Sequence, residues 1–168
     1  DALPISGAGT AAVGLAANVE TIKKTVKAHI DGTAQVQARK DILVQALSEE
    51  EILAIGAAGS YGGSFGGSGS AVIITADTIT QAYILAGPIG TISLVGAGGD
   101  VTVAANGIFT ATMIAGAVGT SSSVGVGASN TTLIHNDTVE AYLGERSRVT
   151  TGGAIGLMMG IDSKEKDK

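Results

Sequence analysis

Apolar and polar residues alternate with a period of two in several short segments of the chain. Three segments show this most clearly: Ala28 to Ile30, Ile42 to Ala46, and Val101 to Val103. A period of two places successive side chains on opposite faces, which is typical of β-strands with one buried face. Gly-Gly and Gly-Asp pairs lie between such segments, and glycine adopts the positive φ of tight turns without steric cost. The pattern therefore predicts strands joined by turns.

The pattern occurs in three related copies. The segment 13–46 aligns with 126–159 without a gap, and 69–105 supplies a third copy between them. The clearest anchors are Lys27-Ala28-His29-Ile30, Gln81-Ala82-Tyr83-Ile84 and Glu140-Ala141-Tyr142-Leu143. The middle copy has five extra residues around Gly87 to Thr91, where a loop is expected. Units this short cannot bury a face alone, so we expect them to stack on one another.

Two segments also fit a helix. Apolar residues between Leu15 and Ile30 follow helical spacing, but the aligned partner at 128–143 is rich in Asn and Thr, so we expect strand in both. Ser48 to Glu51 before Ile52 resembles a helix capping box. For this second segment a short helix and a turn both remain open. Lys23, Lys24 and Lys27 and the run Glu49 to Glu51 are expected on solvated faces.

The composition excludes several classes of protein. Gly, Ala, Thr and Ser supply 82 of 168 residues, and Ile and Val together number 31 against 10 Leu. A helical bundle or a doubly wound enzyme needs more Leu, Phe, Glu and Lys. An apolar fraction of 45% is too high for a disordered chain. The absence of cysteine excludes disulfides and thiolate metal sites.

The charge is acidic and unevenly distributed. A net charge of −5 argues against a nucleic-acid partner. Between Ile52 and Asn136 only Asp77 and Asp100 are charged, which raises the alternative of a membrane-associated protein; glycines and serines interrupt this run too often for a membrane helix. The chain begins without Met or a signal sequence and is expected to be a piece of something longer, with 162–168 as a charged tail or linker.

The repeat resembles that of leukotoxin-type filamentous adhesins, large secreted surface proteins within the filamentous-haemagglutinin-like group. The middle copy is closest, with Gln81 to Ile84 followed by Val95 to Ala105, including Gly99-Asp100-Val101. The third copy keeps Glu140 to Gly144 and Val149 but has Ala154 in the Asp position. The first has His29 in the Tyr position and keeps Asp41 and Ile42. The resemblance covers roughly residues 7–160 and implies a parallel β-solenoid within a surface-exposed fibre.

Physical reasoning supports the same fold class, an all-β parallel β-helix with Gly/Ser-rich corner loops, which we expect to be right-handed. Stacked coils favour Val, Ile and Ala inside and Gly, Asn, Asp and Ser at corners, and this composition supplies both sets. The solenoid is expected over residues 1–161. At about 20 to 25 residues per coil, the chain would form about seven coils and a rod of roughly 35 Å. Uncovered strand edges at its ends predict end-to-end self-association.

Candidate sites are few. Gly62 to Gly66 matches a nucleophile elbow around Ser64, and Asp77 or Asp100 and His135 follow in the order of a serine hydrolase, but the elbow needs a strand before it and a helix after it. Gly96 to Asp100 resembles a calcium loop whose single carboxylate supplies too few ligands. We therefore expect no catalytic, metal or cofactor site. The predicted binding residues are exposed positions of three expected loops, Gly59 to Ser70, Gly87 to Thr91 and Thr120 to Ser123. These residues are Ser64, Phe65, Pro88, Ile89 and Ser122.

These observations predict a non-enzymatic repeat segment of a large secreted bacterial surface adhesin or leukotoxin-like protein. The expected location is the cell surface or outer membrane. Its expected partners are a host-cell surface protein or glycan and neighbouring coils of the same long chain, with no nucleic acid. A membrane-associated protein, or a serine hydrolase using Ser64, is the alternative.

Overall fold

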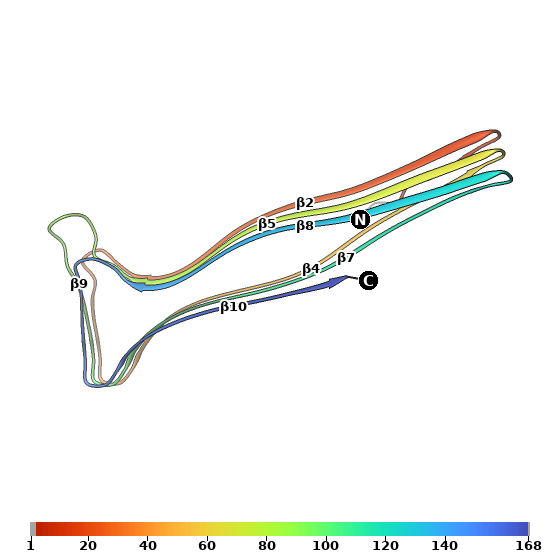
Figure 1. Ribbon diagram of the computed structural model, residues 1–168. Coiled ribbons are helices and arrows are strands. Elements are labelled where there is room, and N and C mark those ends of the chain that lie inside the picture. The colour runs from red at the N-terminus through yellow and green to blue at the C-terminus, as the bar shows by residue number, and fades with distance from the viewer. Residues whose placement is uncertain (1–2, 168) are drawn as a thin grey trace.

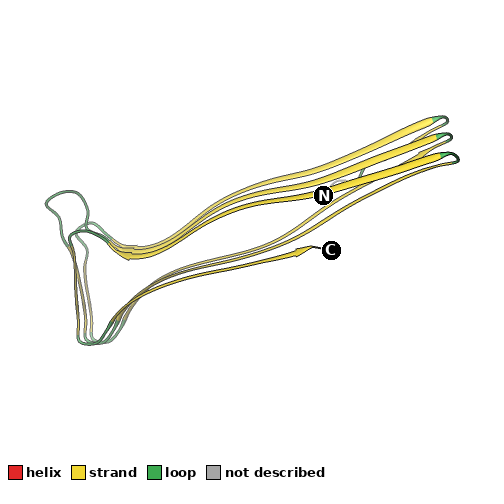
Figure 2. Cartoon of the chain, viewed as in Figure 1, coloured by secondary structure: helices red, strands yellow, loops and turns green. Residues whose placement is uncertain are grey.

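The computed structural model describes residues 3–167 and is all-β over that range (Figures 1 and 2). The strands are β1 (Ile5–Ala8), β2 (Ala11–Ile30), β3 (Gln35–Ala38), β4 (Ile42–Gly62), β5 (Phe65–Ile84), β6 (Ser93–Ala97), β7 (Val101–Ser121), β8 (Val124–Leu143), β9 (Ser147–Thr151) and β10 (Ile155–Asp167). Every pairing between them is parallel. The expected parallel all-β fold is confirmed, and the hand of winding stays a prediction.

The strands form three stacked sheets, β1-β4-β7-β10, β2-β5-β8 and the short β3-β6-β9. The two long sheets meet at one end through tight turns at 9–10, 63–64 and 122–123, which we call the tip. They spread apart at the other end, where the short sheet joins them (Figure 1). We call the short sheet and its flanking corners the base. Each coil therefore runs along one long sheet, turns at the tip, returns along the other, and crosses the base.

The strand register confirms the sequence repeat. Ala28 pairs with Ala82 and Ala82 with Ala141, which are the positions that the three repeat copies align. The expected coil length of about 20 to 25 residues, a typical solenoid period, is wrong, because one repeat copy makes one whole coil. Three coils replace the expected seven: β2–β4, β5–β7 and the shorter β8–β10, with β1 preceding the first. The coils are long because their two main strands have 20 or 21 residues each.

Local predictions have different outcomes. Leu15 to Ile30 lies in β2, so strand is correct there. Ser48 to Glu51 lies inside β4, so the helix and turn alternatives are both wrong; pairing of this segment with Gly107 to Thr110 of β7 fixes it as strand. The segment Gly59 to Ser70, expected as a loop, is strand except at the turn 63–64. β10 also continues through most of the expected tail, to Asp167.

Inward-facing side chains form two apolar clusters. The base cluster comprises Ile42, Val44, Ala46, Ala82, Ile84, Val95, Ala97, Val101, Val103, Ala105 and Ala141. The middle cluster comprises Ile52, Ala54, Val72, Ile74, Ala76, Phe109, Ala111 and Met113. Closer to the tip, the inward positions carry only small residues: Ala12, Gly14, Ala16, Gly56, Ala58, Ser60, Gly66, Ser68 and Ser70. The sheets can approach each other there because almost no side chain lies between them.

Two glycines of β7 test this close approach. A Cβ on Gly119 would overlap the carbonyl oxygens of Val126 and Gly66, whereas a Cβ on Gly116 would have no heavy atom within 4 Å. We expect Gly119→Ala to lower the free energy of unfolding by about 1–3 kcal/mol, since the backbone must move. Gly116→Ala should change it by less than about 0.5 kcal/mol or raise it slightly. Denaturant unfolding of both variants measures the difference, and equal values would contradict the packing.

Candidate interaction surfaces

The five predicted binding residues are all exposed, but they divide between opposite ends of the molecule. Ser64, Phe65 and Ser122 lie at the tip, in and beside the turns that join the long sheets. Pro88 and Ile89 lie at the base, in the connection between β5 and β6. The structure therefore presents two separate surfaces, and no single site contains all five residues.

The tip turns are stacked through backbone hydrogen bonds. The Ser64 amide donates to the Thr10 carbonyl at 2.8 Å, and the Val124 amide donates to the Ser64 carbonyl at 3.2 Å. The Ser122 amide donates to the Gly63 carbonyl at 3.2 Å, and its hydroxyl donates to the same oxygen. Successive turns thus repeat one geometry from coil to coil. The Ser64 side chain stands on the solvent side of this stack.

The surface around the tip is uncharged and partly apolar. Residues 3–19, 52–76 and 101–136 contain no Asp, Glu, Lys or Arg. Large exposed apolar side chains occur on both faces: Val13, Leu15, Tyr61, Phe65, Val118, Val124 and Val126. A shallow groove of about 530 Å³ crosses the outer face of β2, β5 and β8 at Leu15, Gly69 and Ala128. Contiguous exposed apolar surface of this kind marks interaction sites.

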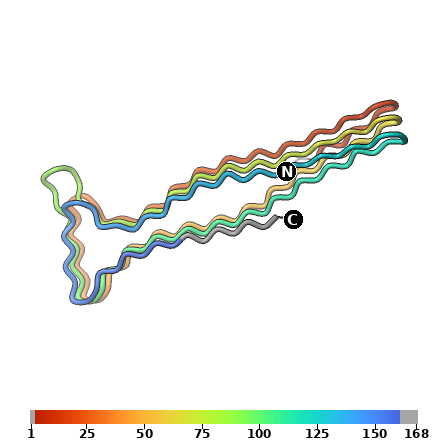
Figure 3. The backbone as a smooth tube through the Cα atoms, in the orientation of Figure 1, coloured from red at the N-terminus to blue at the C-terminus, as the bar shows by residue number. Residues whose placement is uncertain are grey.

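The base carries a loop that only the middle coil possesses. Figure 3 shows the loop, in green, projecting away from the stacked path of the other two coils. Ile89, in the middle of this loop, is 94% exposed. The Thr91 amide and hydroxyl both donate to the Pro88 carbonyl, at 3.1 and 2.7 Å, which closes a turn at Gly90 with φ of 94°. The expected insertion at Gly87 to Thr91 is therefore a defined loop.

Arginines of the third coil lie beside this loop. Arg146 donates from Nη2 to the Gly87 carbonyl at 2.8 Å, and Arg146 itself has a left-handed φ of 56°. A groove of about 370 Å³ is lined by Gly90, Thr91, Ile92, Arg146, Ser147 and Arg148. A second groove of about 470 Å³ adjoins it at Arg148, with Gly96 forming its floor between Gln37 and Thr150. All three arginines of the chain, Arg39, Arg146 and Arg148, belong to the base.

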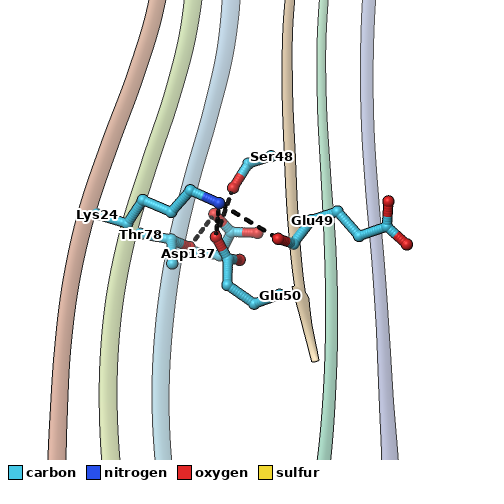
Figure 4. A network of polar contacts seen from close by, with 6 residues as sticks. All are labelled: Lys24, Ser48, Glu49, Glu50, Thr78 and Asp137. Carbon is cyan, nitrogen blue, oxygen red and sulfur yellow. Dashed lines mark hydrogen bonds and ion pairs between the residues drawn. The ribbon is translucent and has the colours of Figure 1, made fainter. Parts of the chain in front are cut away.

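A polar cluster lies between the two long sheets (Figure 4). Lys24 Nζ is 2.5 Å from Glu50 Oε1 and donates to the Glu49 carbonyl at 3.2 Å. Ser48 Oγ donates to the same Glu50 oxygen at 2.8 Å. On the neighbouring strands, Thr78 Oγ1 donates to Asp137 Oδ1 at 2.7 Å. The expectation that Glu50 belongs to a solvated run is wrong, because the period of two turns its side chain inward, where it is only 10% exposed. Lys24 points to the same side but keeps 37% of its side chain exposed.

The hydrolase alternative needs Ser64 and His135 together, and the fold separates them. His135 pairs with Ala76, so it lies twelve residues, or about 40 Å, along the sheet from Ser64. His135 points inward and stacks on Phe109 with ring centroids 3.9 Å apart. Its buried Nε2 has no hydrogen-bond partner among the described residues. The segment around Ser64 is strand, turn and strand, which differs from the strand, turn and helix of a nucleophile elbow.

An aromatic column runs across the coils on the outer face near the base. His29, Tyr83 and Tyr142 stack with centroid separations of 5.1 Å and interplanar angles of 10° and 12°. Burial raises the pKa of the Tyr142 hydroxyl above its ordinary value. The neighbouring Tyr83 and Glu140 raise this pKa further, by smaller amounts. Beside this column, Gln81 Nε2 donates to Glu140 Oε2 at 2.6 Å. The repeat alignment places these three rings at one position, so parallel stacking of the coils brings them together.

Among residues 3–167, no group of three or more His, Asp or Glu side chains is arranged to hold a metal ion. No helix in that range is long and apolar enough to cross a membrane. We also find no match to this chain among protein-family models, curated proteins or solved structures.

The Lys24–Glu50 pair can be tested by a double-mutant cycle. Glu50 is only 10% exposed, so Lys24→Met leaves a largely buried carboxylate without its cation. We expect Lys24→Met and Glu50→Leu each to lower the free energy of unfolding by about 1–3 kcal/mol. The double variant should lose at least about 1 kcal/mol less than the sum. Lys23→Met, which removes an outward-facing lysine next to it, is the control and should change stability by less than about 0.5 kcal/mol.

Proposed function

We propose that the chain is a non-enzymatic repeat segment of a large secreted bacterial surface adhesin or leukotoxin-like protein, which extends and presents binding surface for attachment to host cells. The proposed location is the bacterial cell surface or outer membrane. The proposed partner is a protein or glycan of the host-cell surface. The resemblance of the repeat to filamentous adhesins and the parallel stacked fold both support this function.

The fold supports a role in presenting binding surface, because the packed inward residues that hold the coils together are distinct from the exposed residues of the turns and loops. Inward positions of the three coils are held by packing and by in-register pairing along the whole length of each long strand. The framework therefore stays constant when outward residues change, and recognition can be assigned to turns and loops. Exposed apolar side chains and turns coincide at the tip and at the base loop.

The base loop is the observation that carries the proposal. A repeat that served only as a spacer would need no coil to differ from its neighbours, yet the middle coil alone has this insertion. The loop holds an almost fully exposed isoleucine, Ile89, on a turn closed by Thr91 and anchored by Arg146. An exposed apolar side chain on a fixed loop is suited to insertion into a partner, since little conformational entropy is lost on binding.

Binding of the fluorescently labelled chain to cultured epithelial cells tests the proposal. We expect saturable binding, and we expect Ile89→Asp to weaken it by about tenfold or more, as for the loss of a central apolar contact. Ile134→Asp, which places the same change on the exposed outer face of β8, is the matched control and should bind as the unaltered chain does.

Both variants should unfold at the temperature of the unaltered chain, because both side chains lie outside the packed interior. A chain without saturable binding to any host-cell type would contradict the adhesive function. Equal binding by the Ile89→Asp and Ile134→Asp variants would assign the contact to a surface other than the base loop.

A further inference from the structure

Two of the three tyrosines of the chain are stacked on each other. Tyr83 of β5 and Tyr142 of β8 are register partners, and their ring centroids are 5.1 Å apart with an interplanar angle of 12°. Parallel pairing along the whole of these two strands keeps neighbouring backbones about 4.8 Å apart. The two rings therefore stay in contact for as long as the two coils remain paired.

The neighbours of this pair hold it in place and leave it accessible. His29 stacks on the other side of Tyr83, also at a centroid distance of 5.1 Å. Gln81 Nε2 donates to Glu140 Oε2 at 2.6 Å, which joins the same two strands two residues before the rings. Tyr83 and Tyr142 lie on the outer face of their sheet, and both are partly exposed. An oxidant in solution can therefore reach the pair.

The third tyrosine lies far from this pair. Tyr61 of β4 is 66% exposed, and its register partners are Gly7 and Thr120. It lies beside the tip, whereas Tyr83 lies eighteen residues, or about 60 Å, beyond Phe65 along β5. Within one copy of the chain, Tyr61 therefore cannot reach either of the stacked tyrosines.

We propose that Tyr83 and Tyr142 form an oxidative cross-linking site, at which a haem peroxidase with hydrogen peroxide joins the two rings as dityrosine. Each phenol gives up one electron and one proton and becomes a phenoxyl radical. The two radicals couple through a new bond between one Cε carbon of each ring, and the hydrogen on each of these carbons moves to the phenol oxygen of its own ring. One molecule of hydrogen peroxide takes up the two electrons and two protons and becomes two molecules of water.

The stacked geometry favours this coupling over reactions between separate molecules. Two phenoxyl radicals on separate chains must meet by diffusion, whereas here the second ring is already beside the first, and such proximity corresponds to a very high effective concentration. The torsion χ2 of tyrosine is broad, so each ring can rotate to turn a Cε carbon toward the other. Coupling therefore requires rotation of the rings and a small decrease of their separation, while the strands remain paired.

The cross-link joins the second coil to the third. The first coil has His29 at the equivalent position, and its imidazole has no phenol that could couple in this way. A covalent link between neighbouring coils closes a loop in the unfolded chain and lowers its conformational entropy, which stabilises the paired state. The link does not depend on adhesion to host cells.

Oxidation of the Tyr61→Phe variant tests the site, because this variant retains only the stacked pair. We expect a dilute solution treated with haem peroxidase and hydrogen peroxide to give a monomer with dityrosine fluorescence and a mass smaller by two hydrogen atoms. Cleavage after Asp and Glu should release peptides 78–100 and 141–145 joined to each other.

Adding Tyr83→Phe or Tyr142→Phe to this variant removes one phenol and keeps both rings. We expect at least about tenfold less dityrosine from either double variant, since no second phenol remains nearby. Circular dichroism checks that the variants are folded. Equal dityrosine from these variants would overturn the site. So would a folded Tyr61→Phe chain that gives no dityrosine either with peroxidase or with sulfate radicals from photolysed persulfate, which need no enzyme to reach the rings.

Moving the pair by one coil tests whether stacking is the cause. His29 stacks on Tyr83 at the same distance as Tyr142 does, so His29→Tyr with Tyr142→Phe, again in the Tyr61→Phe chain, places two phenols on the first and second coils. We expect dityrosine to return to within about threefold of the Tyr61→Phe yield, now joining peptides 21–31 and 78–100. Absence of dityrosine from this folded variant would contradict stacking in register as the basis of the reaction.

Discussion

The spacing between the two long sheets governs most other features of the molecule. Near the tip the sheets come so close that Gly119 and Gly66 leave no space for a Cβ, and only Ala, Gly and Ser occupy the neighbouring inward positions. Toward the base the sheets separate, and Ile, Val, Phe and Met fill the wider interior. The sequence therefore grades its inward residues from small to large along each strand. The high glycine and alanine content follows from this gradient more than from turns.

The Lys24–Glu50 pair lies between the middle and base clusters, where a narrow interior must still enclose polar groups. Each part-buried oxygen of Glu50 and Asp137 that bonds Lys24, Ser48 or Thr78 offsets part of its desolvation. Several serines and Asn18 nearer the tip have buried polar atoms without partners among the described residues. Interior polarity of this kind favours one register over its neighbours, since a shift of one residue would turn every charged group to the wrong face.

The repeat made much of the fold predictable. The register of Ala28, Ala82 and Ala141 follows directly from their spacing, and strand in β2 follows from comparison with its aligned copy. Coil length did not follow, because a typical solenoid period assumes short strands, and nothing local indicates strands as long as β2 or β4.

The segment Gly59 to Ser70 was predicted as a loop because glycine is common in turns, but glycine also occurs where two sheets pack closely together. Lys24 and Glu50 were predictable from alternation, since each shares the parity of buried neighbours, but their charge suggested solvent. The proximity of Arg146 to the base loop depends on stacking across coils and has no local signal.

The length of each coil has a mechanical consequence. Each coil contains about 54 to 59 residues but adds only about 4.8 Å, the distance between adjacent strands, to the length of the stack. If tension peels one coil from the end, the chain lengthens by about 180–210 Å at full extension, given about 3.3–3.6 Å per residue. Hydrogen bonds along a peeling strand break one after another instead of all together, so the force stays low while the length released is large. A stack of such coils would therefore lengthen at low force, by an amount set by the number of coils released.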